Sequence, residues 1–586
     1  MAQAARRVAA GVLVAALVLG GPVGPLPAAA GVEEEAAAAR GETGTPDVTG
    51  SLYAAREGQR RLRLDDAITE GLRNNLDVDV ERHAPLIAFE DSRIAWGAFD
   101  PALDFDFGYD GIETPVASSL QTTARIVERK TSGQAGLSGM IPLWGANYSL
   151  LYSGQRLKST SSIQTLSPEY RSSITALLRA PLLRNLVWSE PWTQVRATRI
   201  AHREAREAFR EVVMNTVRDI ELAYWSLVSE RQLLRVARKS LETARALLEQ
   251  TRAQFEVGVI SRVEVTEAEA GVAARELGLI EAENRFRQAQ DRLIFLVYGP
   301  ALEPGQDLEI VPLDRPEDFT RYEADAEVAA GKALDRRPEL ARAREAIERA
   351  EVLLKFARNQ RLPQLDVQVS YGFQGLSGAA NPNALDFTAG TRSLVEQINA
   401  ALAPLQAATG VPATALPAPP PPGPPRVRRT YTGSDEDFFD ADGAHQFSVR
   451  GFLSIPLGNV TARHQVTRAD LELRRARAML RRAEEGVVLE VRDAVRNLAS
   501  ALEGIEAARR RHIAAAEQYR AEQVRLEQGE STPFDTLLRE EDLVEAEAAR
   551  IQAYQRYRDS VVQLERAQGT ILESRNIVVE DVERLR

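Results

Sequence analysis

The residues with the clearest potential for chemistry are two acids, and each stands at the end of the same short pattern. A glycine is followed three positions later by a hydroxyl residue, and three further on by the acid: Gly258, Ser261 and Glu264 in one case, and Gly529, Thr532 and Asp535 in the other. A carboxylate at such a place can attract a cation, or it can favour the first turn of a helix. The glycine is typical of a helix end, and the hydroxyl and acid are typical of the next helix start. Capping therefore accounts for both acids and leaves a second role open.

Other reactive groups are few. The chain has 586 residues, no cysteine, and five histidines scattered through predicted helices and loops. Disulfide scaffolds, thiolate metal sites and cysteine nucleophiles are therefore excluded. The sequence contains no GxSxG, HExxH, P-loop or Rossmann glycine pattern, and the acidic run from Asp435 to Asp442 lacks the EF-hand spacing. We predict that the protein is not an enzyme, and we expect no cofactor and no metal site. A net charge of −11 argues weakly against nucleic acid as a partner.

The N-terminus predicts export. Arg6 and Arg7 precede an apolar run from Val8 to Leu19, and small residues end at Ala30. This pattern indicates a signal peptide over residues 1–30, followed by a flexible leader over residues 31–61. With no cysteine, the mature chain has no site for lipid attachment. No later stretch has 18 consecutive apolar residues, so any membrane span in the mature chain is expected to be a β-barrel. A soluble exported protein remains the alternative at this point.

Two segments alternate strictly between apolar and polar residues, as strands with two different faces do. Their apolar positions are Leu103, Phe105, Phe107 and Tyr109 in the first segment, and Leu365, Val367, Val369 and Tyr371 in the second. Further strands are expected up to about residue 179, within an overall range of 103–179. In the second half strands are expected at about 365–373 and 446–454.

The chain is an internal duplication. Pro101 and Pro363 are separated by the same offset as Tyr109 and Tyr371, and an ordered series of such matches continues through the chain. An ordered series of this kind indicates a repeat rather than chance similarity. We place the first repeat at residues 62–310 and the second at 311–574, with a C-terminal tail at 575–586. A Pro-rich, acidic insertion occupies residues 374–445 of the second repeat.

Each repeat ends in a long helical hairpin. Apolar and small residues recur at alternating steps of three and four from Val213 to Phe255, and again from Val491 to Leu526, which is the pattern of a coiled-coil seam. Residues 203–256 alone would span about 80 Å as a helix. The hairpin tips are expected near Gly258 and Gly529. The predicted fold class is therefore mainly α with β, internally duplicated.

At these positions the chain resembles the TolC-like outer-membrane factors. The resemblance covers roughly residues 62–574. It rests on the duplication, the proline-led strands at 101–104 and 363–366, the strand-to-helix junctions at 180–185 and 455–457, and the tip glycines with their following acids. The family implies a homotrimer that shares an outer-membrane β-barrel and a periplasmic α-helical barrel. It also implies an export duct that works with a periplasmic membrane-fusion adaptor and an inner-membrane transporter, in efflux or in type I secretion.

The resemblance also implies roles for the tips. By motif match, Asp535 lines a constriction at the periplasmic entrance, where three carboxylates surround the threefold axis. The family's second acid position is Leu538 in this chain, and its tip aromatic is Leu526. The adaptor is expected to dock on both tips, at the positions Gly258, Ser261, Glu264, Gly529 and Thr532.

The apolar strand positions are expected to face the lipid of the outer membrane. The family has two strands per half, whereas residues 132–154 resemble an extra hairpin that could enlarge the barrel or form an extracellular loop. The 374–445 insertion is expected to be an external loop. The competing interpretation is an exported structural coiled-coil or adhesive protein without a channel, which would share the heptads but has no need for the alternating strands.

Overall fold

The computed structural model describes residues 59–117, 121, 124–299, 308–410, 414–419, 431–436, 438 and 444–579. The predicted signal peptide (1–30) and nearly all of the predicted leader lie outside the described residues, as does most of the acidic run at 435–442. The chain divides into two compact units. The smaller unit contains two short parallel strands, β1 (Gln59–Leu62) and β6 (Glu309–Pro312). The larger unit contains all other elements.

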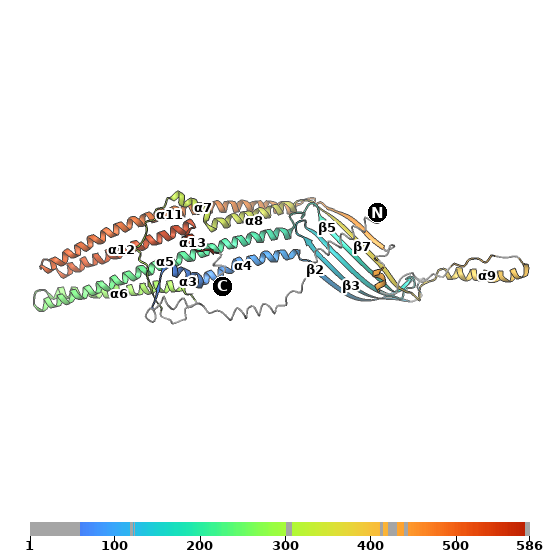
Figure 1. Cartoon of the computed structure of the whole chain (residues 1–586), viewed down its shortest axis with the longest axis horizontal. Helices are drawn as coiled ribbons and strands as arrows, with labels where there is room; N and C mark the ends of the chain where they lie inside the picture. Colours follow the sequence, from blue (N-terminus) through green and yellow to red (C-terminus); the bar gives the residue numbers. More distant parts are fainter. Residues whose placement is uncertain are drawn as a thin grey trace. The chain divides into compact units, whose positions relative to one another are not determined.

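The larger unit runs through helices, strands and a long helical hairpin twice (Figure 1). The first pass consists of α3 (Leu64–Asn74), α4 (Leu76–Trp96), the short helix η1 (Gly97–Phe99), β2 (Ala102–Pro115), β3 (Arg125–Ile141), β4 (Ala146–Ser159), β5 (Leu166–Pro181), α5 (Glu190–Glu256) and α6 (Arg262–Val297). The second pass consists of α7 (Ala326–Arg336), α8 (Pro338–Gln360), β7 (Gln364–Ala380), α9 (Ala389–Thr409), α10 (Tyr431–Glu436), β8 (Ala444–Ser454), α11 (Val460–Glu527), α12 (Pro533–Gln568) and α13 (Ile571–Ser574).

The strands of the larger unit form one six-stranded sheet with the order β2-β3-β4-β5-β7-β8. All five strand pairs are antiparallel. The hairpin expected around residues 132–154 is therefore the β3–β4 pair, and it lies inside the sheet between β2 and β5. The first pass contributes four strands to the sheet and the second contributes two.

The insertion is shorter than the sequence pattern indicated. Residues 374–380, expected in the 374–445 insertion, belong to β7, because their backbone pairs with β5 as far as Leu166. Residues 444 and 445 belong to β8. Backbone pairing of this kind does not need alternating side chains. The strand expected at 365–373 from the alternation is therefore shorter than β7. Between β7 and β8 the described part of the insertion contains the helices α9 and α10.

The helices form a layer four helices wide. Next to the sheet the order is α4, α5, α8, α11, because α5 packs against α4 and α8, and α11 packs against α8. Farther from the sheet the order becomes α6, α5, α12, α11, through contacts of α5 with α6 and α12 and of α12 with α11. Seam positions such as Val213, Ile220 and Leu227 are fully buried in this layer, as is Val491 in the second hairpin.

Both hairpin tips use glycine in the left-handed region, at φ +83° for Gly258 and +78° for Gly529. In each tip two backbone hydrogen bonds close the helix end, such as Glu530 N–H to Arg525 O at 2.9 Å. Thr532 then caps α12, since its hydroxyl accepts the N–H of Asp535 at 3.2 Å. Ser261 takes the N-cap position of α6 but its hydroxyl makes no capping bond, so the expected hydroxyl cap is absent at this tip.

The tip glycine gives a test of the turn. An added Cβ at Gly529 would touch nothing within 4 Å, so the cost of Gly529→Ala is the left-handed backbone alone, about 1 kcal/mol. We expect faster amide hydrogen exchange in the last turn of α11. The matched control is Gly486→Ala inside α11, where an added Cβ is equally free and alanine stabilises the helix by about 0.5–1 kcal/mol. Equal effects of the two substitutions would contradict the assigned turn.

Candidate functional site

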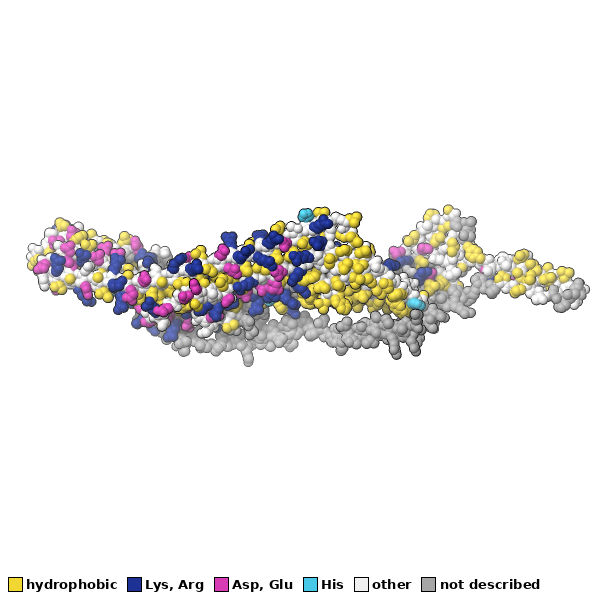
Figure 2. Space-filling model, turned by 90° about the horizontal axis from the view of Figure 1, so that it is seen from above, with side chains coloured by type: hydrophobic (Ala, Val, Ile, Leu, Met, Phe, Trp, Pro, Cys, Tyr) yellow, Lys and Arg dark blue, Asp and Glu magenta, His cyan; other side chains and the backbone are white. Residues whose placement is uncertain are grey.

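One face of the sheet is apolar from edge to edge. Residues that pair directly across antiparallel strands point to the same face. The pairing places one row of side chains on this face: Leu103, Leu137, Leu150, Ala176, Tyr371 and Phe447. The two sets predicted to face lipid, at 103–109 and 365–371, therefore share a face although three strands separate β2 from β7. Figure 2 shows hydrophobic side chains gathered over the sheet and charged ones over the helices.

The edge strand β2 exposes its apolar side chains most strongly. Phe107 is 82% exposed, and Leu103, Phe105 and Tyr109 are exposed as well. In β7 the positions Leu365, Val367, Val369 and Tyr371 are half-buried because neighbouring strands cover both sides. So large an exposed apolar surface marks a contact with lipid or with another chain.

The opposite face of the sheet is polar. It carries Asp104 and Asp106 on β2 and the ion pair between Arg179 Nη2 and Asp366 Oδ2 at 2.7 Å. Serine hydroxyls bridge neighbouring strands on the same face, with Oγ–Oγ distances of 2.7 Å for both Ser153–Ser173 and Ser370–Ser448. A sheet with one apolar and one polar face is suited to separate lipid from water.

Part of the insertion folds back onto the apolar face. The Tyr152 hydroxyl donates to Asp435 Oδ1 at 3.1 Å, and Phe438 is buried against the sheet. Gly375 allows this approach, since an added Cβ there would lie 1.8 Å from the carbonyl oxygen of Ser434. The 374–445 insertion, expected to be an external loop, therefore covers the sheet at Gly375.

The tip of the second hairpin is two-sided. Asp535 is exposed, and so are Leu538 (45%) and Phe534 (52%), on one side of the first turns of α12. On the other side Leu537 is buried, and its Cδ1 atom would lie 3.0 Å from a Cβ added at Gly271 of α6. The three residues predicted at the gate are thus not equivalent, because Asp535 and Leu538 share the exposed side while Leu526 is half-buried on α11.

A buried acid anchors the other side of this tip. The Ser240 hydroxyl of α5 donates to Glu540 Oε1 at 2.7 Å, and Arg275 of α6 lies 3.5 Å from Glu540 Oε2. Burial raises the pKa of Glu540 above the usual glutamate range, and the Ser240 and Arg275 contacts oppose that rise. Sequence reasoning missed this cluster because its members lie far apart in the chain. The sequence contains a weak indication of the cluster. Glu540 follows Asp535 by five positions and therefore lies on a different side of the same helix.

The first tip is exposed and partly apolar. Gly258 and Ser261 lie at its end, and Val257 and Val259 beside them are largely exposed, while Glu264 is half-buried. The predicted docking positions of the second tip, Gly529 and Thr532, are also exposed. Both tips lie at the end of the helical layer away from the sheet (Figure 1).

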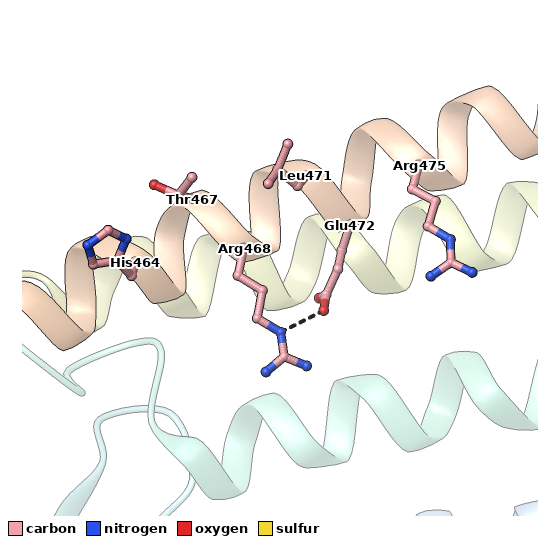
Figure 3. A pocket seen from close by; sticks show the side chains of 6 residues that line it. All are labelled: His464, Thr467, Arg468, Leu471, Glu472 and Arg475. Carbon is pink, nitrogen blue, oxygen red and sulfur yellow. Dashed lines mark hydrogen bonds and ion pairs between the residues drawn. The ribbon is translucent and has the colours of Figure 1, made fainter.

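A shallow surface depression lies along a single helix, α11, as Figure 3 shows, and its one internal ion pair joins Arg468 Nε to Glu472 Oε1 at 2.9 Å. Among the described residues, no three histidines or acids are grouped as metal ligands. None of the described helices combines the length and apolar character needed to cross a membrane.

Solved structures with the same fold are outer-membrane channels. The outer-membrane channel OprN is 14% identical, with a TM-score of 0.58 over 86% of this chain and 90% of its own. The CmeC outer membrane channel of Campylobacter jejuni is 14% identical, with a TM-score of 0.57 over 89% of each chain. The open state of the Neisseria gonorrhoeae MtrE outer membrane channel is 15% identical, with a TM-score of 0.55 over 87% of this chain and 89% of its own.

No curated protein sequence matches this chain. At the level of families, the outer membrane efflux protein family matches residues 150–297 and 426–570, which together make up half of the chain. The match includes both long helical hairpins and strands from each half. The chain therefore belongs to the outer membrane efflux protein family, whose members are channels rather than enzymes, and it is a protein of the outer membrane that extends into the periplasm.

Proposed function

We propose that three copies of this chain form a continuous duct through the outer membrane and across the periplasm. The duct receives substrates from an inner-membrane transporter through a periplasmic membrane-fusion adaptor, in tripartite efflux or in type I secretion. One observation carries the proposal. The six-stranded sheet, with one apolar and one polar face, continues into the layer of helices, and both the sheet and the helical layer have two open edges. A layer of this kind is complete only when copies close it into a tube.

The two open edges support ring closure. One edge consists of β2, α4 and α6, and the other consists of β8 and α11. Exposed apolar residues follow the first edge, among them Val80, Ile87 and Ile94 on α4, and the second, including Leu471 and Leu489 on α11. Because the two edges differ, the contact between copies is head-to-tail, which generates a ring when the rotation from one copy to the next closes on itself.

In such a ring the exposed side of the α12 tip faces the axis. Asp535 and Leu538 then line the periplasmic entrance, and the buried side with Glu540 holds α12 on α5 and α6. The adaptor docks on the exposed tips around Gly258 and Gly529. At the other end of the duct, the polar face of the sheet lines a water-filled lumen.

Reconstitution tests the function directly. The mature chain, extracted in detergent and added to planar bilayers, is expected to give discrete ion-conducting channels, because its lumen is polar. An exported coiled-coil or adhesive protein would instead stay in solution without detergent and produce no channels. Solubility without detergent together with an absence of channels would refute the proposed function.

The Asp535 ring predicts a specific electrical change. Three carboxylates around an axis hold cations, and tight holding in a constriction slows their passage. We expect Asp535→Ala to raise the single-channel conductance for cations and to alter cation selectivity. The matched control is Glu264→Ala at the other tip, which should leave both properties unchanged. Wild-type conductance and selectivity in the Asp535 variant would refute its place at the entrance.

Glu540 predicts a mechanical change at the same tip. Glu540→Ala removes the hydrogen bond to Ser240 and one of the contacts of Arg275, so α12 should separate from α5 and α6 and channels should open more widely. Glu540→Gln keeps the bond to Ser240 and should retain the low conductance. Burial raises the pKa of Glu540, so ionisation of Glu540 as the pH rises through that pKa makes its buried position less favourable, and wild-type channels should open more at high pH. The glutamine variant should lack this pH dependence. Identical behaviour of the alanine and glutamine variants would contradict the anchoring role.

A further inference from the structure

The β3–β4 hairpin continues both faces of the sheet. On the apolar side Leu137 pairs with Leu103 of β2 and with Leu150 of β4. On the polar side Ser138 of β3 pairs with Ser149 of β4. The hairpin therefore has the same two-faced character as β2, and its strands are hydrogen-bonded on both sides, to β2 and to β5. A loop outside the membrane has no need of such a pattern.

At the usual spacings of helices and strands, a six-stranded sheet is about as wide as a layer of four helices. Four helices packed at ~9 Å spacing are ~36 Å wide. Six strands spaced by ~4.8 Å and tilted by ~40° are ~38 Å wide, whereas four such strands are only ~25 Å wide. Since the same copies must close both layers, equal widths let the sheet and the helices close at the same radius.

The edges of a six-stranded sheet also suit closure. An even number of antiparallel strands makes β2 and β8 run in opposite directions, so β2 of one copy can pair antiparallel with β8 of the next. On the polar face β2 carries Asp104 and Asp106, and β8 carries the exposed Arg450. Opposite charges at the two edges favour this pairing over β2 with β2. Lipid offers no partner to unpaired backbone groups, so both edges must be covered by another copy.

We propose that the β3–β4 hairpin is part of the membrane wall, so that three copies close an 18-stranded barrel through β2 of one copy and β8 of the next. The proposal rests on the homotrimeric duct proposed above and adds the wall composition. A barrel with two strands per half would have 12 strands from three copies. Because barrel diameter grows roughly linearly with strand number, the wall proposed here is about 1.5 times wider.

Fluorescent labelling of single cysteines tests the place of the hairpin, and the absence of native cysteine leaves no background. With the protein in vesicles, probes at Leu137→Cys and Leu150→Cys should be quenched by brominated lipid as strongly as at Leu103→Cys in β2. Probes at Ser138→Cys and Ser149→Cys should escape quenching and react with a water-soluble reagent. Within each strand the two labelled positions are neighbours, 137 with 138 and 149 with 150, and they differ in the face of the sheet on which they lie.

The outcomes separate the two proposals. If the probe at Leu103→Cys is quenched while those at Leu137→Cys and Leu150→Cys are not, the hairpin lies outside the wall and this inference is overturned, with the duct intact. If the probe at Leu103→Cys also escapes quenching, the sheet is not in lipid and the proposed function itself fails.

Disulfide cross-linking tests the contact between copies. Asp104→Cys or Asp106→Cys combined with Arg450→Cys should join copies into covalent dimers and trimers on oxidation, because the side chains share the polar face. Phe105→Cys with Arg450→Cys is the matched control and should stay monomeric, since its side chains lie on opposite faces. Absence of cross-links from both polar pairs, with quenching at Leu103→Cys intact, would overturn the β2–β8 contact.

Discussion

The pairing of backbone groups at the sheet edges is the constraint on which the rest of this structure depends. Lipid cannot satisfy an open N–H or C=O group, and each unsatisfied group costs several kcal/mol. One copy presents two such edges, β2 and β8, beside an apolar face that continues across all six strands. The sheet is therefore stable in a membrane only as a segment of a closed wall. In the proposed duct, the head-to-tail relation of its edges sets the symmetry of the assembly.

In that duct the helical layer would continue the same symmetry away from the sheet, and charged contacts hold the two halves of the layer together. Arg575 makes two bonds to the fully buried Glu221, at 2.8 and 2.7 Å, and so fixes the chain after α13 on α5. Arg566 of α12 bridges Glu490 of α11 at 2.6 Å and Asn215 of α5 at 3.2 Å. Removing Arg575 from the fully buried Glu221 would cost about 3–5 kcal/mol, whereas the pair of Arg566 with the partly exposed Glu490 contributes far less. These contacts join the helices of the layer farther from the tips, and the Glu540 cluster joins α12 to α5 and α6 nearer the tip.

Much of this architecture follows from the sequence because its signals are local. The alternation at 103–109 and 365–371 correctly predicted strands with a common apolar face, and the tip glycines correctly predicted the left-handed turns. The family resemblance is confirmed by the match to both hairpins. The hairpin at 132–154 was expected, but its place was left open between the barrel and an extracellular loop. The glycines and serines of β3 weaken its alternation, and only its pairing with β2 and β4 shows that the hairpin lies inside the sheet. Contacts between distant residues were also out of reach: Ser240 meets Glu540 and Arg575 meets Glu221 across hundreds of positions, although Arg575 was expected in a tail. The roles of the tip residues stay predictions.

Electron cryomicroscopy of the protein reconstituted in lipid tests the central claim most directly, because the strands crossing the bilayer can be counted in one section. The account predicts three copies around an axis and 18 strands, with β8 of each copy beside β2 of the next. A closed wall of 12 strands, with the β3–β4 hairpin outside the lipid, would contradict the account, as would a sheet whose edges remain unpaired in lipid.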